Sequence, residues 1–138
     1  IANGGNILEP HVLKEIKDGN GETVAKTAPK VRRQLSIAPE YFQVVREGMR
    51  LTTTEIGTAP VMASLPIAIG AKTGTAELGV DRKRVNSWFI GFAPFDNPKI
   101  AIATVLEGGH VSNLVGATTA TKHMIEWLII YRPDMLGI

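Results

Sequence analysis

The stretch VNSWFIGFAPFDNPKIAIATVL, from Val85 to Leu106, decides the fold, because it places two apolar runs of strand length around a turn. Val85–Phe95 and Lys99–Leu106 are rich in aromatic and β-branched residues, which favour strands. Asp96-Asn97-Pro98 has the composition of a tight turn. Strands joined so closely pair antiparallel. We therefore expect a β-hairpin over residues 85–107.

Another strand is expected immediately upstream, over residues 67–76 (IAIGAKTGTA). Further upstream, residues 10–27 alternate apolar and polar side chains around the turn Asp18-Gly19-Asn20-Gly21, which predicts a second β-hairpin. The strands together predict a mainly antiparallel sheet, and no linker between them indicates a domain boundary.

Two amphipathic helices are expected to pack on this sheet. Pro39 and Glu40 suit a first helical turn, so one helix should span residues 39–52. Its expected apolar face consists of Tyr41, Phe42, Val44, Val45, Met49 and Leu51. A second helix should span residues 115–131, with the apolar series Ala117, Thr121, Met124, Leu128 and Tyr131. The predicted class is α+β, with a core formed by Trp88, Phe89, Phe92 and Trp127 between sheet and helix.

Composition excludes several classes of function. The 138 residues include no Cys, so thiol catalysis, disulfides and Cys-based zinc sites are excluded. The three His residues form no ligand pair at helical spacing, and we expect no metal and no cofactor. A net charge of +2, with basic groups that lack interleaved aromatic residues, does not point to nucleic acid.

Lys72-Thr73-Gly74-Thr75 is the strongest candidate for a site. On an edge strand, a lysine ammonium and two threonine hydroxyls can bind a carboxylate, and a glycine lets a ligand backbone approach closely. A backbone N–H of the same strand could face an oxyanion. Alternatively, the motif is a turn of small residues with a surface lysine. A nucleotide-binding loop is disfavoured, since Ala71 stands where that loop requires glycine.

The serine nucleophile that usually accompanies K-T-G is absent from this chain. None of the four Ser residues begins an S-x-x-K or an S-x-N motif, and none lies in G-x-S-x-G. The residues therefore supply a binding motif without a group that could attack a carbonyl.

Several blocks taken in order resemble the C-terminal part of the transpeptidase domain of class B penicillin-binding proteins, most closely the elongation (rod-shape) type. The blocks are IANGGN (1–6), PHVLKEIKDGNGE (10–22), Gly57-Thr58-Ala59, AKTGTAE (71–77), SWFIGFAP (87–94), NPKIAIATVLEGG (97–109) and the closing helix. The resemblance covers nearly all of residues 1–138. It implies a five-stranded antiparallel sheet with helices on both faces, the fold shared with serine β-lactamases.

The resemblance also implies roles for the motif. Lys72 would organise proton transfer and hold the substrate carboxylate. Thr73 and Thr75 would bind that carboxylate in a D-Ala-D-Ala stem peptide or a β-lactam, and the Thr75 N–H would form half of the oxyanion hole. Gly74 would keep the strand flat against the ligand. The implied enzyme is a serine-type peptidoglycan D,D-transpeptidase that crosslinks stem peptides by acyl transfer.

The chain departs from the family because the acylating serine and the S-x-N motif lie upstream of an IANGG-like block. We therefore expect Ile1 to be an internal position, the first part of the domain to be absent, and this segment to be inactive alone. The alternatives are a non-catalytic cell-wall-binding module and a serine β-lactamase or D,D-carboxypeptidase. The resemblance implies the bacterial cell envelope, on the periplasmic face of the cytoplasmic membrane, with an N-terminal anchor not contained here. An exposed sheet edge beside Ile100–Leu106 would pair with the rest of the domain or form a homodimer.

Overall fold

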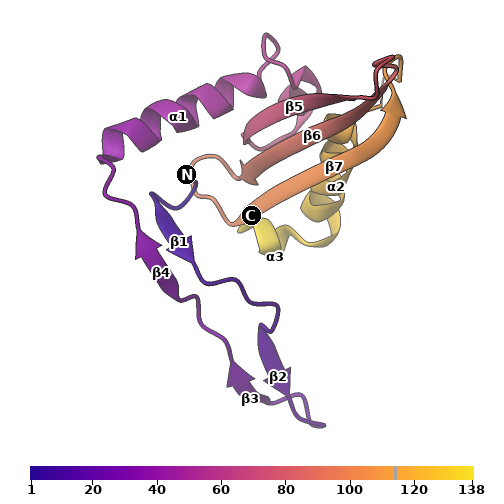
Figure 1. Ribbon diagram of the computed structural model, residues 1–138. Helices are drawn as coiled ribbons and strands as arrows, with labels where there is room; N and C mark the ends of the chain where they lie inside the picture. The colour runs from indigo at the N-terminus through magenta and orange to yellow at the C-terminus, as the bar shows by residue number, and fades with distance from the viewer. Residues whose placement is uncertain (114) are drawn as a thin grey trace. The chain divides into compact units, whose positions relative to one another are not determined.

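A computed structural model describes residues 1–113 and 115–138. Its elements are shown in Figure 1. In chain order they are β1 (Asn6–Leu8), β2 (Glu15–Lys17), β3 (Thr23–Lys26), β4 (Val31–Gln34), α1 (Pro39–Thr52), the 3₁₀ helix η1 (Pro60–Ser64), β5 (Gly70–Leu78), β6 (Arg84–Ala93), β7 (Ile100–His110), α2 (Ala117–Tyr131) and α3 (Pro133–Leu136).

The chain divides into two compact units by its internal contacts. The first unit comprises residues 3–42 with Ile1, and the second comprises residues 43–138 with Ala2. The boundary falls between Phe42 and Gln43 inside helix α1, where the sequence has no linker. Composition does not reveal this boundary, because it arises from which strands pair with one another.

The first unit consists of two short antiparallel ladders. β1 pairs with β4, and β2 pairs with β3 within the segment predicted as a hairpin. Asp18 closes the β2–β3 turn, because its carboxylate accepts hydrogen bonds from the backbone N–H groups of Asn20 and Glu22, both at 2.9 Å. Gly21 has a φ of +85°, a conformation that favours glycine.

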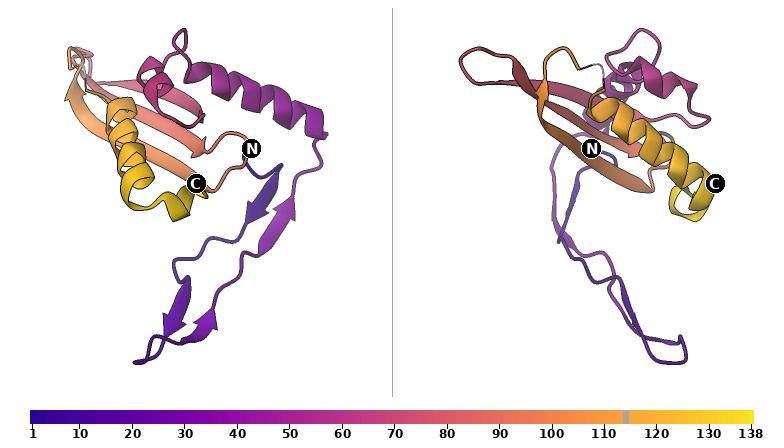
Figure 2. Two further views of the ribbon diagram at one scale, coloured as in Figure 1. Left: turned by 180° about the vertical axis from the view of Figure 1, so that it is seen from behind. Right: turned by 90° about the vertical axis from the view of Figure 1, so that its right-hand side faces the viewer.

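The second unit contains a three-stranded antiparallel sheet in the order β5-β6-β7. The backbone N–H of Lys99 donates to the carbonyl of Ala93 at 2.9 Å and closes the turn between β6 and β7. α2 packs against β6 and β7, as the two views in Figure 2 show. The predicted α+β class with an antiparallel sheet is therefore confirmed. The sheet has three strands within the described residues, where the resemblance implies five.

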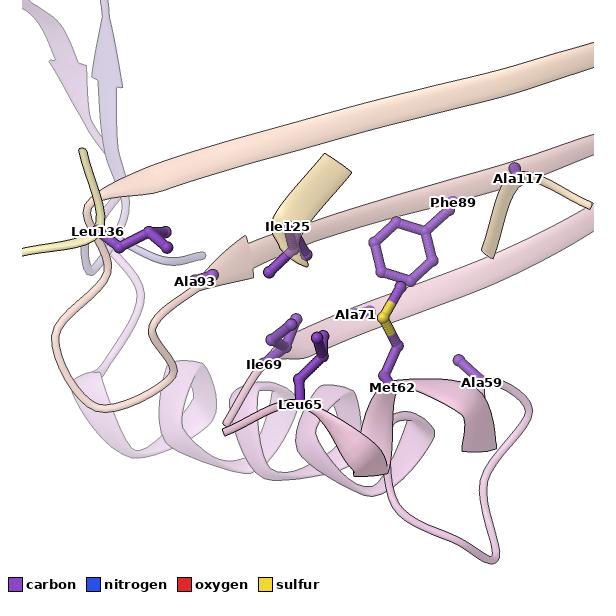
Figure 3. Packing of buried hydrophobic residues seen from close by; sticks show 10 residues of the cluster. All are labelled: Ala59, Met62, Leu65, Ile69, Ala71, Phe89, Ala93, Ala117, Ile125 and Leu136. Carbon is purple, nitrogen blue, oxygen red and sulfur yellow. The ribbon is translucent and has the colours of Figure 1, made fainter. Parts of the chain in front are cut away.

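A small apolar core fills the space between the sheet, α2 and η1. Its members come from five elements and the segments beside them, as Figure 3 shows. They are Ala59, Met62, Leu65, Ile69, Ala71, Phe89, Ala93, Ala117, Ile125 and Leu136. Phe89 is completely buried and belongs to the central strand, so it anchors the sheet to this core.

The predicted core was right for Phe89 and Phe92 and wrong for both tryptophans. Phe92 is 3% exposed, whereas Trp88 is 44% exposed and Trp127 is 53% exposed. The prediction was wrong for Trp88 because strand side chains alternate between faces, so Trp88 projects from the face opposite to its neighbour Phe89. The prediction was wrong for Trp127 because a different face of α2 packs on the sheet, and Ile125 is the residue buried there.

Both helices bury less of the expected apolar face than the spacing suggested. On α2, Ala117 and Thr121 are buried as expected, while Met124 and Tyr131 are more than half exposed. On α1 the buried residue is Phe42, whose ring lies against Gly5. Met49 is half-buried, and the other four members of this face, which are Tyr41, Val44, Val45 and Leu51, are exposed.

Arg46 fastens α1 to the turn between β6 and β7. Its guanidinium donates hydrogen bonds to the carbonyls of Ala2 at 2.9 Å and Phe95 at 2.6 Å. It also lies 5.2 Å from the ring centroid of Phe92 and 5.3 Å from that of Phe95. The cation is therefore held by two carbonyls and two aromatic faces, which keep Arg46 beside this turn.

Two surface groups near the C-terminus have shifted pKa values. Hydrogen bonds from Lys122 and then His123 lower the pKa of Glu126 on α2. The carboxylate of Asp134 raises the pKa of Arg132 through a hydrogen bond and charge attraction. No helix in residues 1–113 or 115–138 is long and apolar enough to cross a membrane.

Candidate substrate-binding strand

The K-T-G-T motif lies on β5, an edge strand of the three-stranded sheet. Strand β5 begins at Gly70, so residues 67–69 of the predicted strand precede it. Lys72, Gly74 and Thr75 are exposed, and Thr73 is half-buried. Because side chains alternate along a strand, Thr73 and Thr75 share one face, and Lys72 and Gly74 share the other. Lys72 and the two threonines therefore lie on opposite faces of β5, and all three belong to the same edge strand.

Lys72 folds back along its own strand. Its ammonium donates a hydrogen bond to the backbone carbonyl of Thr73, and its side chain is exposed. An ammonium has three donors. The other N–H donors of Lys72 remain available to an anion at this edge. The positive charge of the ammonium favours a carboxylate.

Thr73 has a partner from a distant loop. The Oγ1 atoms of Thr73 and Thr58 are 2.7 Å apart, within hydrogen-bonding distance. Thr58 lies between α1 and η1, and no sequence pattern assigned it a role of its own. The signal that could have drawn attention to it is its place in the block Gly57-Thr58-Ala59, which carries part of the family resemblance.

Gly74 differs from Gly70 and Gly91 in what a side chain there would meet. A Cβ at Gly74 would lie 3.5 Å from the Cβ of Trp88, an ordinary contact. A Cβ at Gly70 would lie 2.5 Å from the ring of Phe92, and one at Gly91 would lie 2.8 Å from the carbonyl oxygen of Gly70. Packing therefore requires glycine at positions 70 and 91. At position 74 the described residues leave room for a side chain.

The serines of the sheet region have structural partners. The Ser87 hydroxyl accepts a hydrogen bond from the backbone N–H of Ala117 at 2.9 Å, at the start of α2. Ser112 Oγ lies 2.7 Å from His110 Nδ1, but both residues are exposed and two positions apart at the end of β7. His110 pairs with Arg84 of β6. The Ser112–His110 pair is therefore not paired with a residue of the K-T-G-T motif in the sheet.

An apolar hollow lies away from the motif. It has a volume of about 570 Å³ and is lined by residues of β7, α2 and α3, all apolar except His123. Its lining residues are Ile100, Ala101, Ile102, His123, Met124, Trp127, Leu128 and Met135. β7 is the opposite edge of the sheet from β5, so this hollow is separate from the K-T-G-T edge.

Solved structures with this fold are transpeptidase domains of penicillin-binding proteins. The D,D-transpeptidase domain of a peptidoglycan glycosyltransferase from Eggerthella lenta is 28% identical, with a TM-score of 0.72 over 96% of this chain and 30% of that chain. Penicillin-binding protein A from M. tuberculosis, solved as a penicillin G acyl-enzyme complex, is 27% identical, with a TM-score of 0.65 over 93% of this chain and 29% of that chain. The fold is therefore the β-lactamase-like fold of these domains.

The family model described as penicillin binding protein transpeptidase domain matches residues 1–125. The chain belongs to the class B penicillin-binding protein transpeptidase family. Penicillin-binding protein 2A of Bacillus subtilis is 34% identical over 77% of this chain, and the peptidoglycan D,D-transpeptidase PbpA of Mycolicibacterium smegmatis is 32% identical over 79%. The peptidoglycan D,D-transpeptidase MrdA of Escherichia coli is 29% identical over 94%. The chain spans 17%, 22% and 22% of these three relatives.

Proposed function

We propose that residues 70–78 form the substrate-binding edge of a serine-type peptidoglycan D,D-transpeptidase. The observation that carries the proposal is the open edge of β5, where Lys72, Thr73 and Thr75 lie within four consecutive positions of one strand. Lys72 and the two threonine hydroxyls bind the carboxylate of a D-Ala-D-Ala stem peptide or a β-lactam. The Thr75 N–H contributes to the oxyanion hole, where it stabilises the tetrahedral intermediate.

The reaction is acyl transfer on a serine that the rest of the protein supplies. The serine oxygen attacks the carbonyl of the penultimate D-Ala, the peptide bond to the last D-Ala breaks, and that D-Ala leaves as a free amino acid after taking up a proton. An amine from a neighbouring stem peptide then attacks the acyl-enzyme, which releases the serine and forms the crosslink. Lys72 acts in this scheme by holding the substrate carboxylate and by organising proton transfer.

The rest of the transpeptidase domain is the proposed partner of the β7 edge. Within the described residues β7 pairs with β6 alone, and the apolar hollow lies directly beside it. The relatives are several times longer than this chain, so a large part of the homologous protein is available to cover both features. Its first segment would add to the sheet at β7 and fill the hollow, in preference to a homodimer through the same edge.

The relatives named as D,D-transpeptidases support a place in the bacterial cell envelope. Peptidoglycan lies outside the cytoplasmic membrane, so we propose that the domain faces the periplasm and that an N-terminal segment anchors it. The order of the sequence blocks that carry the family resemblance is the ground on which we also propose an elongation-type enzyme.

Intact mass after incubation with penicillin G tests this function. The 138-residue chain alone is expected to keep its mass, because it has no S-x-x-K serine to acylate. The full-length protein is expected to gain the mass of one drug molecule, since opening the β-lactam ring expels no atom. A full-length protein that stays unmodified at saturating penicillin would contradict a transpeptidase function and favour a cell-wall-binding module.

Gly74→Ala is expected to separate binding from folding. The added methyl group makes only an ordinary contact within the chain, but it would collide with a ligand that lies along β5. The acylation rate of the full-length protein should therefore fall about 10-fold or more. Its thermal stability should stay near that of the wild type.

Gly70→Ala is the matched control, because its methyl group would meet the Phe92 ring and should lower stability by about 1–3 kcal/mol. The measurements are the acylation rate with a fluorescent penicillin and the melting temperature. If Gly74→Ala loses stability as Gly70→Ala does, the glycine serves packing and not the ligand.

A further inference from the structure

Thr58 reaches the binding strand from a loop that is distant in sequence. Its Oγ1 lies 2.7 Å from Oγ1 of Thr73, fifteen residues further along the chain. Thr73 is half-buried on β5, and Thr58 is exposed between α1 and η1. The two hydroxyls therefore meet at the edge where the substrate carboxylate is proposed to bind.

The loop that carries Thr58 is held firmly on both sides. The N–H of Ala59 donates to the carbonyl of Thr52 at 2.8 Å, and Ala59 is completely buried. A Cβ at Gly57 would lie 2.2 Å from the carbonyl oxygen of Thr52, so this tight return after α1 requires glycine. Thr53 Oγ1 donates to the carbonyl of Ile69 at 2.6 Å, directly before β5. These contacts fix the loop against the start of the binding strand.

The donor capacity of a hydroxyl sets the direction of the bond. A threonine hydroxyl has one hydrogen to donate and two acceptor sites. A carboxylate can only accept, so Thr73 must donate its hydrogen to the substrate. Thr73 Oγ1 is then the acceptor toward Thr58, and Thr58 is the donor. If Thr73 instead donated its hydrogen to Thr58, the lone pairs of Thr73 Oγ1 would face the anion and repel it.

We propose that Thr58 is a positioning residue whose hydroxyl donates to Thr73 and directs the Thr73 O–H toward the substrate carboxylate. The inference rests on the proposed function of β5. The bond from Thr58 also strengthens the binding of the carboxylate by Thr73, because a hydroxyl that accepts a hydrogen bond becomes a stronger donor. Thr58 does not touch the substrate in this scheme, and it acts through Thr73 alone.

The test measures acylation of the full-length protein by penicillin G in wild type, Thr58→Val and Thr58→Ser. Valine has nearly the same shape without the hydroxyl, so the second-order acylation rate constant should fall about 3- to 10-fold, the range for one neutral hydrogen bond. Serine keeps the hydroxyl and should recover most of that loss. Thr54→Val is the matched control in the same loop, because its hydroxyl donates to the carbonyl of Leu51 and not to β5.

Two further readouts separate positioning from a merely structural role. With the methyl ester of penicillin G, which lacks the carboxylate, wild type and Thr58→Val should react at the same rate. In a Thr73→Val background, adding Thr58→Val should cause no further loss. Equal losses on acid and ester, additive losses in the double variant, or no loss at all would each overturn the inference.

The outcome for the wild type keeps the two proposals apart. If the wild-type protein is acylated while Thr58→Val is unaffected, the function stands and the role of Thr58 fails. If the wild-type protein is not acylated, the function fails, and the inference fails with it.

Discussion

Replacing Lys72 with alanine is expected to lower acylation of the full-length protein by penicillin about 100- to 1,000-fold, the range measured for removing one group that stabilises charge in an active site. The ammonium is the cation of the K-T-G-T edge, and it is exposed there beside Thr73. Without it the substrate carboxylate would rest on neutral hydroxyls alone, which bind an anion less strongly than a charge does.

Folding should not change in this variant. Lys72 is exposed, and its hydrogen bond goes to a carbonyl of its own strand, so its loss leaves no buried group without a partner. The measurements are the acylation rate with a fluorescent penicillin and the melting temperature. Lys83→Ala, at an exposed position between β5 and β6, is the control for lost surface charge. Equal effects of the two substitutions would contradict a specific anion site at Lys72.

Phe89→Ala is expected to lower the free energy of unfolding of the 138-residue chain by about 3–5 kcal/mol. Phe89 is completely buried in the central strand β6, where it pairs with Thr73 on one side and Thr104 on the other. Removing its ring leaves a cavity in the core of Figure 3. The surrounding residues come from several elements and cannot all move in to fill it.

Ile90→Ala is the matched control, one residue further along the same strand. Ile90 is 49% exposed and projects from the opposite face of the sheet. Its replacement should cost about 1 kcal/mol or less. Urea unfolding followed by circular dichroism measures both variants. A comparable loss in Ile90→Ala would mean that the apolar core does not lie on the face that carries Phe89.

Local patterns predicted the elements of the sheet well, because strands and turns depend on neighbouring residues. Asp96-Asn97-Pro98 connects two apolar runs so closely that antiparallel pairing is the natural outcome, and β6 and β7 pair in this way. Pro39 and Glu40 mark the start of a helix for equally local reasons, and α1 begins at Pro39. The K-T-G-T motif lies on a strand as expected, although that strand starts at Gly70.

Burial was predicted less well, because it depends on which elements meet. Trp88 and Trp127 have the composition of core residues, yet both are about half exposed. The face of α1 has the spacing of a buried stripe, and Phe42 alone among its large apolar side chains is buried. Spacing shows that a helix has an apolar side, but only the neighbouring elements decide whether that side is covered.

The sequence by itself determined the α+β class, the antiparallel hairpin of 85–107 and the family, because these follow from local patterns and from motifs in a fixed order along the chain. Only the tertiary structure decided that β5 is an edge strand and that Thr58 meets Thr73 there. It also decided where the chain divides into two units. The physical reason is that edges, distant hydroxyl pairs and burial arise from contacts between residues far apart in the chain, which no local pattern encodes.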